Sequence, residues 1–220
     1  MFQYWKRMMM AVVACCLLLT GCNSQKEETK TEEEKIEISE NAVYLAPKEP
    51  TEYMKTAYDE VSKALQKSDE EAEAQALAKL FVADFFTLSN KDSETDIGGL
   101  NYIPSGVYED MEMYARFYFY NNYSMIVSEL GKDQLPTVTD VTIKDTELAD
   151  IVYDGQSYSG YKVSVEITYA DTEASDLKTA ATLSVAKMDD YDYDTLESID
   201  SGELTETPLP KTLMRVIALE

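Results

Sequence analysis

The sequence predicts an α+β domain, in which helices come first along the chain and an antiparallel sheet follows. Two periodicities carry this prediction. Between residues 52 and 130 the large apolar residues recur every three or four positions, whereas beyond Pro136 they recur every second position. Because the two patterns occupy separate halves of the chain, helices packed on one face of a sheet are favoured over alternating βαβ units.

Two helices open the predicted domain. The apolar residues of the first, from Glu52 to Lys67, form a single stripe. The second begins at once, because Ser68 and Glu71 have the spacing of a capping box. It extends to about Ser89. Its stripe consists of Leu77, Leu80, Phe81, Phe85 and Leu88.

A third, longer helix is predicted from about Gly106 to Leu130. Ser105 is placed to cap its N-terminus, and Gly131 to cap its C-terminus. Aromatic residues surround its middle almost completely, which indicates cover on more than one side. We therefore expect this helix to be the central one of the domain. The aromatic residues are Tyr114, Phe117, Tyr118, Phe119, Tyr120 and Tyr123.

Four strands complete the prediction. The clearest alternation runs from Tyr161 to Tyr169, and it indicates a strand with one buried face. Residues 137–148 are its expected partner across a turn at Asp154-Gly155. Residues 177–188 and 211–219 supply the other two strands of an antiparallel meander. Because some of these strands exceed the usual five or six residues, the sheet is expected to be strongly curved.

The N-terminus has the features of a targeting signal. Lys6 and Arg7 precede an apolar run that ends at Leu19, which has the arrangement and length of a secretory signal and is too short for a membrane-spanning helix. Leu19-Thr20-Gly21-Cys22 resembles a bacterial lipobox. The resemblance implies cleavage before Cys22, lipid on its thiol, and a cell-membrane anchor on the extracytoplasmic face, in a Gram-positive-type envelope. Two acyl chains suffice for stable anchoring.

The predicted signal and cleavage site divide the chain into three parts. Residues 1–21 are the predicted signal peptide, residues 22–50 the lipidated cysteine with a flexible acidic tether, and residues 51–220 a single α+β domain. The order and lengths of the elements in this domain resemble the cone-shaped architecture of nuclear-transport-factor-two-like and cystatin-like proteins. The resemblance implies a curved sheet that wraps a long helix and leaves a cavity, and it does not choose a function.

The composition of the chain excludes several kinds of functional site. The chain has no histidine, and its three cysteines all lie at or before residue 22, so triads that need histidine and the usual zinc sites are excluded. We predict no cofactor. With 42 acidic and 19 basic residues the net charge is −23, and nucleic acid is therefore not an expected partner.

Asp84 is the sharpest candidate for a functional residue, because it lies on the apolar stripe of the second helix. A buried carboxylate needs a partner, or it becomes a neutral acid that can serve catalysis. Arg116 is the predicted partner, and a structural ion pair is the preferred interpretation. Together with Asp84 and Arg116, a tyrosine cluster forms a candidate ligand pocket, with core packing as its alternative. The tyrosines are Tyr102, Tyr114, Tyr118 and Tyr120.

Two loops are further candidates. Asp190, Asp192 and Asp194 alternate as in a calcium loop, but Thr195 stands where an EF-hand has glycine, so a solvated acidic turn is preferred to a metal site. The apolar residues between Asp96 and Pro104 either enter the core or line the mouth of a cavity.

These observations favour a non-enzymatic binding or assembly module of the cell envelope, which binds a protein or small ligand beside the membrane. An enzyme of the same fold is the alternative, using Asp84 and tyrosines on a small or glycan substrate. A solute-binding lipoprotein of a transporter is a further alternative, although such proteins usually have two α/β lobes.

Overall fold

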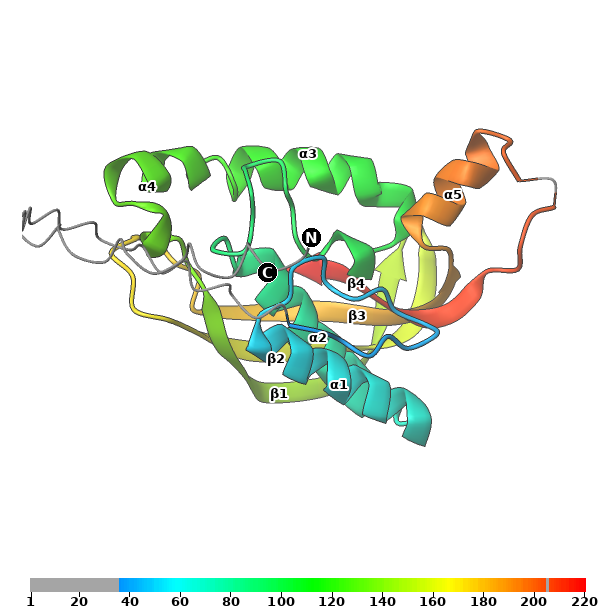
Figure 1. Cartoon of the computed structure of the whole chain (residues 1–220). Helices are drawn as coiled ribbons and strands as arrows, with labels where there is room; N and C mark the ends of the chain where they lie inside the picture. Colours follow the sequence, from blue (N-terminus) through cyan, green and yellow to red (C-terminus); the bar gives the residue numbers. More distant parts are fainter. Residues whose placement is uncertain (1–35, 205) are drawn as a thin grey trace, which may run out of the picture. The chain divides into compact units, whose positions relative to one another are not determined.

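The computed structural model describes residues 36–204 and 206–220, and it confirms the α+β class (Figure 1). Strands β1 (Val138–Tyr153), β2 (Gln156–Tyr169), β3 (Ala180–Asp190) and β4 (Lys211–Leu219) form one antiparallel sheet in chain order. The lipobox lies outside the described residues. None of the helices in the described part is long and apolar enough to cross a membrane.

Helix α1 (Glu52–Lys67) has the predicted bounds, but its junction with α2 (Glu70–Phe86) differs from the prediction. Ser68 adopts the left-handed conformation and ends α1. The side chain of Asp69 accepts the N–H of Ala72 and caps α2 instead. The predicted capping box was therefore wrong by one residue, because the chain must reverse at Ser68 before a new helix can begin.

Helix α2, rather than the aromatic segment, is the central helix. Small residues such as Ala74, Ala78 and Ala83 are fully buried along with the large apolar ones, so α2 is covered on most sides. It packs against α1 and against all four strands. The expectation that the third helix is central was wrong, since small side chains let neighbouring elements approach a helix more closely than rings do.

The predicted third helix is broken into α3 (Tyr108–Tyr118) and α4 (Tyr123–Glu129). Tyr120 leaves the helical path and is completely buried, where its hydroxyl donates to the carbonyl of Phe85. Ser105 does not cap a helix, because its side chain donates to Asp190. Tyr114, Phe117 and Tyr118 are 50–69% exposed, so the aromatic face is open to solvent.

The sheet follows the predicted meander. Asp154 and Gly155 both have positive φ, which is the backbone that a tight hairpin between β1 and β2 requires. β1 and β4 are the outer strands. Short helical turns η1 (Leu100–Tyr102), η2 (Ser105–Val107) and η3 (Lys132–Gln134), with α5 (Tyr193–Asp200), complete the domain. Helix α5 was not predicted from the sequence.

The packed domain includes Tyr44, which lies in the predicted tether of residues 22–50. Tyr44 is 3% exposed, and its hydroxyl donates to Glu73 and accepts the N–H of Met214 on β4. Its carbonyl accepts from the hydroxyl of Tyr58 in α1. This segment therefore joins the helical layer to the first half of the outer strand.

Candidate functional site: an apolar groove beside the sheet edge

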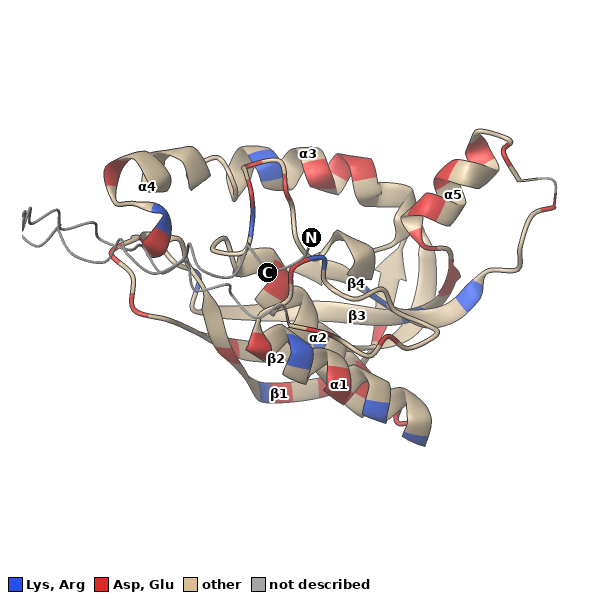
Figure 2. Cartoon of the chain, viewed as in Figure 1, with Lys and Arg blue, Asp and Glu red and all other residues tan. Residues whose placement is uncertain are grey.

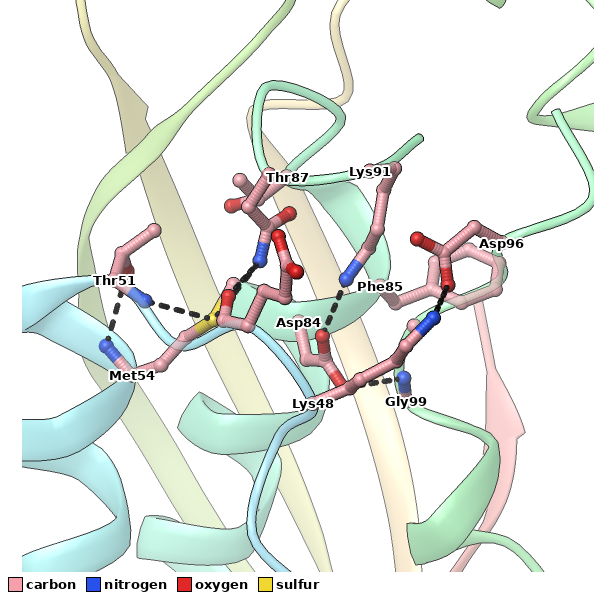
Figure 3. A network of polar contacts seen from close by, with 12 residues as sticks. Lys48, Thr51, Met54, Asp84, Phe85, Thr87, Lys91, Asp96 and Gly99 are labelled. Carbon is pink, nitrogen blue, oxygen red and sulfur yellow. Dashed lines mark hydrogen bonds and ion pairs between the residues drawn. The ribbon is translucent and has the colours of Figure 1, made fainter. Parts of the chain in front are cut away.

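Asp84 forms a buried ion pair with Lys91, not with Arg116 (Figure 3). Its Oδ1 lies 2.7 Å from the Lys91 ammonium, and its Oδ2 accepts the N–H of Gly99 at 2.7 Å. Arg116 is exposed on α3. The prediction of a structural pair was thus right in kind and wrong in partner, because the chain returns over the end of α2 and brings Lys91 to the carboxylate.

Two glycines allow this arrangement. A Cβ on Gly98 would lie 2.1 Å from the carbonyl oxygen of Asp84, and Gly99 has a φ of +79°. The loop can therefore lie against α2 closely enough for its main chain to bind the carboxylate. With both oxygens engaged within the protein, Asp84 lacks the free face that a general acid or base needs.

The four candidate tyrosines separate into two groups. Tyr102 and Tyr120 are fully buried, and their hydroxyls donate to the main-chain carbonyls of Leu45 and Phe85. Burial raises the pKa of both phenols. Tyr114 and Tyr118 lie on the exposed face of α3 with their rings 4.6 Å apart. The structure therefore does not bring the four together with Asp84 as one pocket.

Two of the three alternating aspartates have structural roles, and Asp194 is exposed. Asp190 is at the end of β3, and it accepts from Arg215 at 2.7 Å and from both the N–H and the hydroxyl of Ser105. Asp192 caps α5 through the N–H of Thr195. No group of three possible metal ligands occurs among the described residues.

An apolar groove of about 420 Å³ lies between α3 and the second half of β4. Met111 and Tyr114 of α3 form one wall, and the β4 residues 216–219 form the other. Its remaining apolar lining comes from Phe81, Ile103, Pro104, Val107 and Phe119. Asp110 is the one charged residue in the lining.

An acidic cleft of about 360 Å³ shares Asp110 with the groove. It lies between the start of α3 and α5, where the rings of Tyr108 and Tyr193 stack with centroids 3.9 Å apart. The hydroxyl of Tyr193 donates to Glu109, and this hydrogen bond raises the pKa of Tyr193 to about 12. The other acidic residues of the cleft are Glu197 and Asp200.

Of the sequence candidates, only the apolar loop and Tyr114 reach the groove. Ile103 and Pro104 line it, whereas Leu100 and Tyr102 of the same loop enter the core. A sequence feature that could have indicated the groove lies at the C-terminus. There Val216, Ile217, Ala218 and Leu219 are apolar without alternation. A strand that is apolar on both sides is typical of one covered on both faces or beside a cavity.

Comparisons of the chain with protein-family models, curated proteins and solved structures find no match.

Proposed function

We propose that the chain is a membrane-anchored extracytoplasmic lipoprotein of the cell envelope and that its domain is a non-enzymatic binding module. The lipobox pattern at Leu19–Cys22, after a basic and an apolar stretch, supports the anchor. The groove between α3 and β4 supports the binding role, and it is the observation on which that role depends.

The groove has the properties of a binding site rather than of an active site. Apolar side chains make up most of its lining, and a few polar groups at the rim can orient a ligand. The buried carboxylates Asp84 and Glu73 and the partly buried Asp190 all accept hydrogen bonds from other protein groups, and none lines the groove. The chemistry of the groove therefore favours binding over turnover.

The anchor is tested by Cys22→Ala, with Cys16→Ala in the apolar run as the matched control. Only Cys22→Ala should abolish incorporation of labelled palmitate and release the protein from the detergent phase on partitioning. Palmitate labelling of Cys22→Ala at the wild-type level would reject the anchor.

The binding role is tested by replacing Tyr114 with the photo-cross-linker benzoylphenylalanine in intact cells. Leu148 is the control position, because it is 71% exposed and lies on β1 at the opposite edge of the sheet. Irradiation should produce an adduct from Tyr114 and none from Leu148. Equal adducts, or none from Tyr114, would show that the groove is not occupied in the cell.

A further inference from the structure

The second half of β4 presents open main-chain hydrogen-bonding groups at the groove. Thr182 of β3 and Glu220 exchange both of their hydrogen bonds, at 3.1 and 2.9 Å. In an antiparallel pair the adjacent residue then directs its N–H and C=O away from the partner strand. That residue is Leu219, which lies opposite Leu183 and lines the groove.

The first half of the same edge is covered. The N–H of Met214 donates to the hydroxyl of Tyr44 at 2.9 Å, so the segment before α1 occupies this part of β4. Beyond β3, no described residue forms a main-chain hydrogen bond with Leu219. An uncovered edge strand is a template for another extended chain.

The groove beside this edge can hold the side chains of such a strand. Met111, Tyr114 and Phe119 form an apolar wall within reach of β4. An added strand directs alternate side chains to opposite sides, so every second side chain would enter the groove. The intervening side chains would point the opposite way, so a charged residue of the segment can meet Asp110 only beyond the apolar ones, at the end of the groove where α3 begins.

The negative charge at the rim of the groove favours a partner with basic residues. Asp110 belongs to both the groove and the acidic cleft, and the cleft adds Glu109, Glu197 and Asp200. Figure 2 shows acidic residues along α3 and α5. A second copy of this chain, with a net charge of −23, would bring acid against acid. Basic residues on a partner are therefore favoured.

We propose that the groove binds an extended segment of a partner protein, in which every second residue is apolar and lysine or arginine stands at one end, as an added strand on β4. This inference rests on the binding role proposed above and names the chemistry of its occupant. The main chain of the segment pairs with the Leu219 region, its apolar side chains fill the groove, and its basic side chains meet Asp110 and the acidic cleft.

The test uses the full chain in phosphatidylcholine vesicles, which lack the net negative charge that would attract basic peptides. The probes are seven-residue peptides with Val, Leu or Phe at every second position and Lys or Arg at one end. Matched probes carry Glu in place of the basic residues, or N-methyl groups on alternate peptide bonds. Binding is measured by co-sedimentation, with protein-free vesicles as blank.

At least one basic peptide should bind, and the glutamate and N-methylated versions should bind at least tenfold more weakly. Met111→Gln and Asp110→Asn should each lower affinity about fivefold or more. Their controls are Met113→Gln, 56% exposed on the same helix, and Asp145→Asn on β1, and both should leave affinity unchanged. Thermal melts verify that each variant is folded.

Three results would overturn the proposal. Equal binding of the N-methylated peptides would reject strand addition, and equal binding of the glutamate peptides would reject charge selection. If none of the basic peptides binds at millimolar concentration, the proposed occupant is wrong. Two results would then show that the binding role survives with a different ligand. One is a cross-linked adduct at position 114 in cells, and the other is binding of free palmitate that Met111→Gln weakens.

Discussion

The ion pair of Asp84 and Lys91 offers the strongest test of the core. Its two side chains are 8% and 6% exposed, and the charged atoms lie 2.7 Å apart, so it belongs with buried pairs rather than with surface pairs. Lys91→Met keeps the stem and removes the charge. The Asp84 carboxylate would keep only its hydrogen bond from Gly99. We expect a loss of about 3–5 kcal/mol in unfolding free energy.

Asp84→Asn strands the ammonium of Lys91 and should cost a similar amount. The double variant removes both charges, so it should cost clearly less than the sum of the single variants. For a chain of this size each kcal/mol lowers the melting temperature by about 2–4 °C, which makes each single effect on the order of 10 °C.

Urea unfolding followed by far-ultraviolet circular dichroism measures these free energies, because the one tryptophan of the chain lies at position 5, outside the described residues. Arg116→Met is the control, since Arg116 is exposed, and it should change stability by less than about 0.5 kcal/mol. A coupling energy below roughly 0.5 kcal/mol between Asp84 and Lys91 would show that they act independently and refute the reasoning.

Other predictions concern the close contacts and buried charges. Gly98→Ala should cost on the order of 1–3 kcal/mol, because the new Cβ would meet the main chain of Asp84, whereas Gly106→Ala has open space and should cost little in the same urea assay. Burial raises the pKa of Glu73, so its ionisation opposes folding at neutral pH and this opposition is lost as pH falls through its folded pKa toward the unfolded value of about 4.5. Glu73→Gln should therefore raise the melting temperature at pH 7 and lose this advantage near pH 4; an equal shift at both pH values would contradict the assignment. Asp190→Asn should lower stability by several kcal/mol, because it leaves the buried charge of Arg215 with only the main-chain carbonyls of Asn101 and Tyr191 as partners. Asp194→Asn, at an exposed position, should not lower stability. Equal melting temperatures for these two variants would argue against a stabilising pair of Asp190 and Arg215.

Local patterns predicted much of the fold. The bounds of α1 and β4, the hairpin turn at Asp154-Gly155 and the antiparallel meander all follow from periodicity and turn chemistry within short windows. The break between α3 and α4 did not follow, because burial of the Tyr120 ring and its bond to Phe85 oppose a continuous helix. The resemblance to the cone-shaped architecture stays a prediction.

The candidate site was less predictable than the fold. The position of Asp84 on an apolar stripe correctly indicated a buried charge in need of a partner. The choice between Arg116 and Lys91 depended on how the loop after α2 returns over that helix, which no periodicity encodes. The exposed rings of α3 were equally beyond a pattern that counts apolar residues, because aromatic residues around a helix do not indicate which sides are covered.

The sequence by itself determined the order of helices and strands, the net charge of −23, the absence of histidine and the lipobox pattern. These properties are local or additive along the chain. Only the tertiary structure decided that Tyr44 covers the first half of β4 and that α3 lies across a groove beside its second half. Such contacts join residues more than a hundred positions apart, and their geometry depends on how the whole core packs.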